Sequence, residues 1–133
     1  MTLTSITEDQ TSNSGQTIAS IIASAGGDRI TDVDSGAVEG IAITSQTSGN
    51  GSWQYSINGG SNWLSFGAVS NSSALLLRST DLVRFVPNGQ NSTSASFIFR
   101  AWDQTGATAG AQGTKVDTST NGNTTPFSAA TET

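Results

Sequence analysis

The chain contains neither cysteine nor histidine. Without cysteine it has no disulfides, no thiolate nucleophile and no thiolate ligand for structural zinc. Without histidine it lacks the usual general base of enzymes and the commonest ligand of transition metals. Serine and threonine are numerous, but no histidine is present to activate them, and no spacing of the acids nominates a glycosidase pair. The sequence therefore predicts a protein that is not an enzyme.

Positive charge is also scarce, because lysine and arginine together number only five and the net charge is −5. The five cations are dispersed along the chain, so they cannot form a surface that follows nucleic-acid phosphates. No apolar run approaches the roughly 20 residues that span a bilayer. Met1 is followed by polar and acidic residues instead of a basic and then apolar leader. We predict no nucleic-acid partner and no membrane insertion, and any export signal would lie in a larger parent chain.

Small polar residues dominate what is present. Serine and threonine together number 40 and glycine 15 in a chain of 133 residues, of which only 11% are charged. This composition lacks the high charge of disordered tails and is typical of short strands joined by turns. The length fits one domain, and no internal repeat is visible. Residues 1–133 are therefore predicted to be a single module.

The clearest strand pattern is at residues 51–57, where Trp53, Tyr55 and Ile57 alternate with polar residues and share one face. The turn-forming string NGGSN follows at 58–62, and Trp63 opens the returning strand. Shorter patterns predict further extended segments, at residues 3–6, 40–44, 75–77, 82–86, 97–102 and from 127 onward. About seven short strands with frequent turns indicate a β-sandwich.

One stretch has the period of a helix instead. Ile18, Ile21, Ile22 and Ala25 follow the spacing i, i+3, i+4 and i+7, and two glycines at 26–27 can end the helix. We therefore predict one short helix in an otherwise all-β chain.

Five strings in this order resemble one family. They are LTSITED at 3–9, AGGDRITDVDSG at 25–36, WQYSINGGSNW at 53–63, VRFVPNG at 83–89 and FIFRAWD at 97–103. Together they resemble the tandem cadherin-like repeats of very large bacterial secreted and surface proteins, including adhesins with toxin-type calcium-binding repeats.

The resemblance implies an immunoglobulin- or cadherin-like β-sandwich, a secreted or cell-surface location, and neighbouring repeats of the same parent chain as partners. It also implies calcium at the junctions between modules, and a cell-surface protein or glycan as the adhesion target. Such repeats continue past the segment that matches FSAATET at 127–133, so the last strand is expected to be truncated here.

Acidic residues supply the candidate metal ligands, because hard cations such as calcium take six to eight oxygen ligands. The candidates lie at predicted strand ends and turns, and Glu132 can add a further oxygen: Glu8, Asp9, Asp32, Asp34 and Asp103. We predict that they gather at one pole of the sandwich. The alternative is that they are ordinary turn residues, since aspartate bonds its own backbone in turns. An EF-hand is excluded, because no glutamate stands at loop position 12 and the flanks are not helical.

The three tryptophans support a second hypothesis, a carbohydrate-binding module with an exposed aromatic platform. Trp53 is predicted to be buried because it shares a face with Tyr55. Trp102 is the best candidate for exposure, since it lies opposite Phe97 and Phe99 in strand parity. The first hypothesis is a non-catalytic structural and adhesive module. A patch of exposed aromatic side chains would favour the carbohydrate hypothesis instead.

Overall fold

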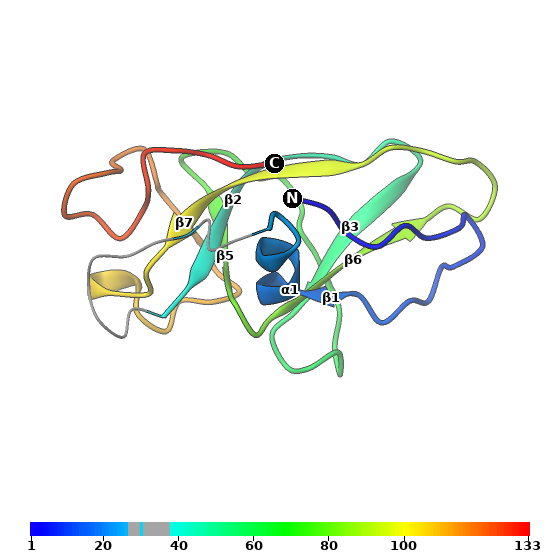
Figure 1. Cartoon of the computed structure of the whole chain (residues 1–133), viewed down its shortest axis with the longest axis horizontal. Coiled ribbons are helices and arrows are strands. Elements are labelled where there is room, and N and C mark those ends of the chain that lie inside the picture. Colours follow the sequence, from blue (N-terminus) through cyan, green and yellow to red (C-terminus); the bar gives the residue numbers. More distant parts are fainter. Residues whose placement is uncertain (27–29, 31–37) are drawn as a thin grey trace.

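The computed structural model describes residues 1–26, 30 and 38–133. It contains two antiparallel four-stranded sheets, which confirms the all-β sandwich predicted from the sequence (Figure 1). The first sheet has the strand order β1 (Gln16–Thr17), β6 (Leu82–Pro87), β3 (Gly51–Ser56) and β4 (Leu64–Ser65). The second sheet has the order β7 (Ser96–Trp102), β2 (Gly40–Thr47), β5 (Ala74–Arg78) and β8 (Lys115–Val116).

The main core lies between the two sheets and follows the predicted alternation. Trp53 and Tyr55 on β3 are buried and lie opposite Phe85 and Val83 on β6. The central strand β5 contributes a run of leucines that is almost completely inaccessible to solvent. Ile57 differs from the prediction, because β3 ends at Ser56 and the Ile57 side chain is 37% exposed.

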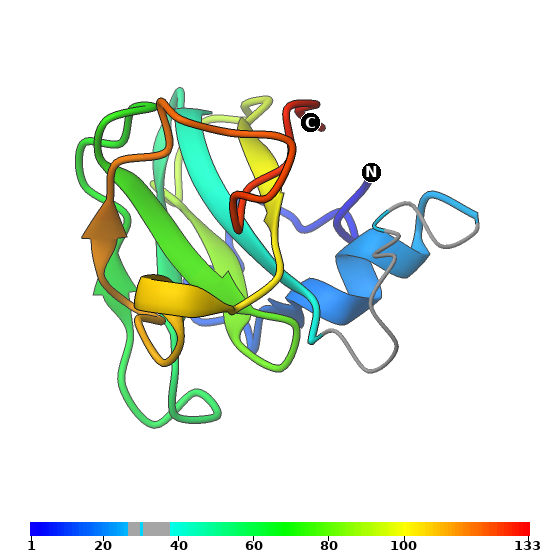
Figure 2. The ribbon, with the colours of Figure 1, turned by 90° about the vertical axis from the view of Figure 1, so that its left-hand side faces the viewer.

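The predicted helix is present as α1 (Ile18–Ala23), which is six residues long and so ends before Ala25. Thr17 caps its first turn, because the Thr17 side chain accepts a hydrogen bond from the backbone N–H of Ser20. The three isoleucines of the helical stripe are buried in the core. Figure 2 shows α1 beside the sandwich, on the side where both chain termini lie.

A second, smaller core covers the outer face of the β7-β2-β5-β8 sheet. Its buried residues are Ala42, Ala74, Leu76, Trp102 and Phe127. The segment after β7 forms this cover. It includes the 3-10 turn η1 (Gly106–Thr108) and strand β8, and it returns along β7 toward the C-terminus (Figure 1, orange to red). Both faces of this sheet are therefore buried.

Two of the expected strands do not form ladders within the described chain. Residues 3–6 carry no strand, because neighbouring amides bond side chains: the N–H of Thr4 donates to Gln16 Oε1 and that of Thr2 to Ser24 Oγ. Residues 127–133 lie along β7 but form no strand ladder with it, and the two bridges between them are isolated, Trp102 with Phe127 and Phe99 with Glu132.

The two ends of the sequence meet at one place. The Met1 ammonium donates a hydrogen bond to the Thr133 carbonyl at 2.8 Å, and Figure 1 shows the N and C labels close together. This meeting point adjoins the open side of the sandwich, between the edge strand β7 of one sheet and the edge strand β1 of the other.

Candidate functional site

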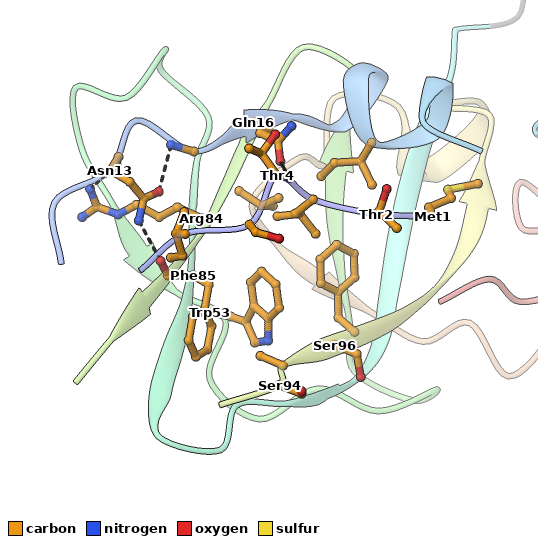
Figure 3. Close-up of a pocket in the computed structure, with 18 of the residues that line it drawn as sticks. Met1, Thr2, Thr4, Asn13, Gln16, Trp53, Arg84, Phe85, Ser94 and Ser96 are labelled. Atoms are coloured by element: carbon orange, nitrogen blue, oxygen red, sulfur yellow. Dashed lines mark hydrogen bonds between the residues drawn. The ribbon is translucent and has the colours of Figure 1, made fainter. Parts of the chain in front are cut away.

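A pocket of about 660 Å³ opens between the sheet edges at this side of the sandwich (Figure 3). We call it the edge groove. One wall is the N-terminal segment, residues 1–6, and the opposite wall is the stretch 93–97 that leads into β7. In Figure 3 Met1, Thr2 and Thr4 lie along the first wall, and Ser94 and Ser96 along the second. Its volume lies within the range of small-molecule sites.

The floor of the edge groove is aromatic. Trp53 lies at its centre, with ring centroids 5.2 Å from Phe85 and 5.1 Å from Phe97, both edge-on. The Trp53 Nε1–H donates to the Thr47 carbonyl at 2.9 Å, which fixes the indole in place. The polar end of the ring is thus satisfied internally, and Trp53 is only 4% exposed, so the ring belongs to the main core that lies beneath the groove.

A polar cluster borders the groove on the outer face of β6. The Arg84 guanidinium donates from Nε and Nη2 to Gln54 Oε1 at 2.9 and 2.7 Å, and from Nη1 to the Asn13 carbonyl. It also stacks on Trp63, 4.1 Å from the ring centroid. Partial burial lowers the pKa of Arg84, since desolvation disfavours its charged form. Sequence patterns did not indicate this cluster, because its members come from three separate parts of the chain, at residues 13, 54–63 and 84.

The predicted metal ligands occupy distant parts of the structure. Asp103 follows the end of β7 at which Trp102 pairs with Gly40, and its Oδ1 accepts hydrogen bonds from the N–H and hydroxyl of Thr105. Glu8 and Asp9 are exposed and lie in a turn. Asp32 and Asp34 lie outside the described residues.

The turn that holds Glu8 and Asp9 belongs to the other end of the sandwich. It continues into Thr11, whose methyl lies 3.8 Å from the position a Cβ on Gly89 would take. Gly89 follows the end of β6 near Asn50, and the N–H of Asn50 donates to the side chain of Thr93, just before β7 begins. The structure therefore does not bring Glu8 and Asp9 together with Asp103.

Glu132, named as a further oxygen donor, is exposed and bridges Phe99 in the middle of β7 through its backbone. Within the described part of the chain, no group of three or more acidic, cysteine or histidine side chains is placed to hold a metal ion. In the described chain these acids lie in turns or beside a sheet edge. Asp103 is an example, because its Oδ1 accepts a hydrogen bond from the backbone N–H of Thr105 in the turn that follows.

The carbohydrate hypothesis depends on an exposed tryptophan, and its best candidate was Trp102. Trp102 is 0% exposed, so the expectation that it is exposed is wrong. The sequence correctly predicted that Trp102 lies on the face of β7 opposite Phe97 and Phe99. That face, however, is covered by the smaller core. Trp63 is the half-buried tryptophan, and the Arg84 guanidinium occupies one of its ring faces.

The sequence also did not indicate an ion pair in which the carboxylate is buried and the guanidinium is partly exposed. Asp81 is 2% exposed, and its carboxylate accepts from the backbone N–H of Arg78 and from the Arg78 guanidinium, with the shortest contact at 2.7 Å. The guanidinium also donates to the Ile57 carbonyl. This pair connects the two ends of the turn between β5 and β6. Its charged groups are hydrogen-bonded within the fold, which indicates a structural role and not a reactive site.

Comparison with protein-family models, with curated proteins and with solved structures found no match to this chain. A search of the described residues for a helix long and apolar enough to cross a membrane found none.

Proposed function

We propose that the chain is a non-catalytic structural and adhesive module of a larger secreted or cell-surface protein. The observation that carries this proposal is the placement of the tryptophans. Trp53 and Trp102 are 4% and 0% exposed, each inside a packed core, so the side chains that a sugar platform would use serve the fold instead. The resemblance to cadherin-like repeats supports the same assignment.

The surface chemistry is consistent with this role. Of 133 residues, 40 are serine or threonine, and the chain has neither histidine nor cysteine. Many of these hydroxyls bond the local backbone, as Thr114 does with the Ala111 carbonyl and Thr125 with that of Gly122. A surface of small neutral polar groups suits a spacer that is exposed to water and has few charges.

The proposal predicts no useful affinity for polysaccharides. Titration calorimetry of the full chain against marine, plant and bacterial glycans should give no saturable heat. Trp63→Ala is the discriminating variant, because Trp63 is the half-buried tryptophan of the described chain. Saturable binding that disappears in Trp63→Ala would replace our proposal with the carbohydrate-binding hypothesis.

Calcium stabilisation stays a prediction of the sequence and its family resemblance. Extracellular calcium modules have dissociation constants of about 10⁻⁴–10⁻³ M. At about 10 mM calcium, such binding would stabilise the fold by roughly 1–3 kcal/mol, seen as a higher melting temperature. We expect Asp103→Asn or Asp32→Asn to reduce this increase. Glu8→Gln is the matched control, because the Glu8 turn lies at the opposite end from Asp103. An unchanged melting temperature with calcium would show that these acids are turn residues only.

A further inference from the structure

Asparagine followed by glycine occurs four times in the chain, at residues 50–51, 58–59, 88–89 and 121–122. Such a pair can react with itself, because glycine has no side chain to hinder the approach of its backbone nitrogen to the asparagine Cγ. The product is a five-membered succinimide, which water opens to aspartate or isoaspartate. The four pairs are alike in sequence, so their surroundings in the fold decide which of them react.

The side-chain carbonyl of Asn58 accepts two hydrogen bonds. The Ser56 hydroxyl donates to Asn58 Oδ1 at 2.8 Å, and the N–H of Asn62 donates to the same oxygen at 2.9 Å. Ser56 Oγ itself accepts the N–H groups of Asn58 and Gly60, so its own proton is the one that points to Asn58 Oδ1. Because Ser56 is 1% exposed and bonded on every side, this donor is held in place.

Asn88 has the same arrangement just after β6. The N–H groups of Gln90 and Asn91 both donate to Asn88 Oδ1 at 3.0 Å. Two fixed donors thus point at the amide oxygen here as well, although both come from the backbone. Any negative charge that develops on this oxygen would be stabilised without rearrangement of the turn.

The glycine nitrogens that would attack are free in both turns. Within the described chain no acceptor is found for the N–H of Gly59 or of Gly89. Both glycines are exposed, with φ angles of 69° and 76°. Beyond the chain neighbours, no atom lies within 4 Å of a Cβ placed on Gly59, and the nearest to one on Gly89 is a methyl of Thr11 at 3.8 Å. These turns therefore have room for the succinimide ring to close.

The pair at residues 121–122 is held at both reacting nitrogens. Asn121 Nδ2, which would leave, donates to the carbonyls of Thr118 and Ser119 at 3.0 and 3.2 Å. The N–H of Gly122, whose nitrogen would attack, donates to the Phe127 carbonyl at 2.7 Å. This hydrogen bond has to break before the Gly122 nitrogen can lose its proton, so the fold opposes the reaction here.

The pair at residues 50–51 is held by its place in the sheet. Asn50 Nδ2 donates to the Ser92 carbonyl, and the Asn50 carbonyl accepts the N–H of Asn88. Gly51 begins β3, where a Cβ would collide with the ring of Phe85. The backbone nitrogen of Gly51 thus has no room to turn toward the Asn50 side chain.

We propose that Asn58 and Asn88 are sites of spontaneous deamidation in the folded protein, and that the fold protects Asn50 and Asn121. Each event converts a neutral side chain to a carboxylate and makes a chain of net charge −5 more negative. The isoaspartyl product also inserts a carbon atom into the backbone of the turn. The two exposed turns would therefore change in charge and shape as the protein ages.

The reaction at Asn58 needs only water as a second reactant. The Gly59 nitrogen gives its proton to a solvent base and bonds to Asn58 Cγ, and negative charge develops on Oδ1. The hydrogen bonds from Ser56 and Asn62 stabilise that charge. The bond from Cγ to Nδ2 then breaks, and Nδ2 leaves as ammonia with a proton from water. A water molecule adds to either ring carbonyl and opens the ring to aspartate or isoaspartate.

All four sites can be followed in one sample. The full chain is incubated at mildly alkaline pH, in buffer or in guanidinium chloride, and is then digested with pepsin at acidic pH, where succinimide formation stops. Mass spectrometry with electron-transfer fragmentation assigns aspartate and isoaspartate to each position. In the folded chain Asn58 and Asn88 should react at least as fast as in the unfolded chain. Asn50 and Asn121 should react about tenfold or more slowly than when unfolded, because they need local opening first.

Ser56→Ala tests the role of the hydroxyl at Asn58. Deamidation of Asn58 should slow by about tenfold, the effect of one hydrogen bond to a developing charge. Asn88 is the internal control, because its two donors are backbone N–H groups that the variant keeps. Unchanged slow rates at Asn50 and Asn121 would show that the variant is folded. If the variant does not fold, the comparison of the folded and unfolded parent chain decides the proposal.

Three results would overturn the proposal. The first is an unchanged or faster reaction of Asn58 in folded Ser56→Ala, which would mean that the hydrogen bonds do not promote the reaction. The second is a slower reaction of Asn58 and Asn88 in the folded chain than in guanidinium chloride, which would mean that these turns protect their amides. The third is equal rates at all four sites in the folded chain, which would mean that the reaction follows unfolding.

Discussion

Replacing Trp53 by alanine should destabilise the protein by about 3–5 kcal/mol, because the substitution leaves a large cavity in the main core. The Trp53 ring lies within 6 Å of the centroids of Phe66, Phe85 and Phe97 and is 4% exposed. Its Nε1–H also satisfies the Thr47 carbonyl. Since domains of this size have total stabilities of about 5–15 kcal/mol, the change should be large in urea denaturation at 25 °C.

Trp63→Ala is the matched control for this experiment, because it removes the same side chain from a half-buried position. It loses the stacking with Arg84, which corresponds to about 0.5–1 kcal/mol. Trp53→Phe keeps a ring in the core and should have an intermediate effect. Equal, small losses for Trp53→Ala and Trp63→Ala would show that Trp53 does not support the core.

Much of the β-sandwich could be predicted because its long strands alternate clearly and end at turn residues. Strands β3 and β6 formed where extended segments were followed by asparagine, glycine or proline signals, and β2 and β7 formed at the predicted apolar segments 40–44 and 97–102. The isoleucines of α1 have helical spacing, and spacing was sufficient to find the helix. Local patterns of this kind depend on neighbouring residues and need no knowledge of the tertiary fold.

Features that depend on distant partners were not predictable in the same way. Residues 3–6 alternate as a strand would, but the bonds of this segment go to the side chains of Gln16 and Ser24. The acids Glu8 and Asp103 both sit beside turns, and only the strand pairing shows that these turns belong to opposite ends. The edge groove follows from the same long-range geometry, since no single motif contains its two walls.

Trp102 gives the most instructive difference between sequence and structure. Parity along β7 correctly placed it on the face opposite Phe97 and Phe99. That face is covered by the glycine- and threonine-rich segment after β7, whose few apolar residues have no regular period. Periodic patterns of apolar residues cannot predict such a covering segment. Its residues Ala111, Val116 and Phe127 are nevertheless enough to exclude water from the Trp102 indole.

Trp102→Ala should therefore be as damaging as a substitution in the main core, with an expected loss of about 3–5 kcal/mol in urea denaturation. The indole is fully buried, and its Nε1–H donates to Thr108 Oγ1 at 2.9 Å. Gly40 fits against it closely, because a Cβ at Gly40 would lie 2.7 Å from the Trp102 ring. The segment that covers β7 should lose its main apolar contact, so its amides should exchange faster in the variant.

Thr108→Val separates the hydrogen bond from the packing. It removes the acceptor for Nε1 and retains a side chain of similar shape, so the expected loss is about 1–2 kcal/mol. A Trp102→Ala variant that loses less than Thr108→Val would mean that the second core does not hold the covering segment. In that case Trp102 would be accessible in solution, and the glycan titration should be repeated with Trp102→Ala beside Trp63→Ala. We expect Trp102→Ala to be much less stable than Thr108→Val. This order would show that the Trp102 indole stabilises the fold by its packing.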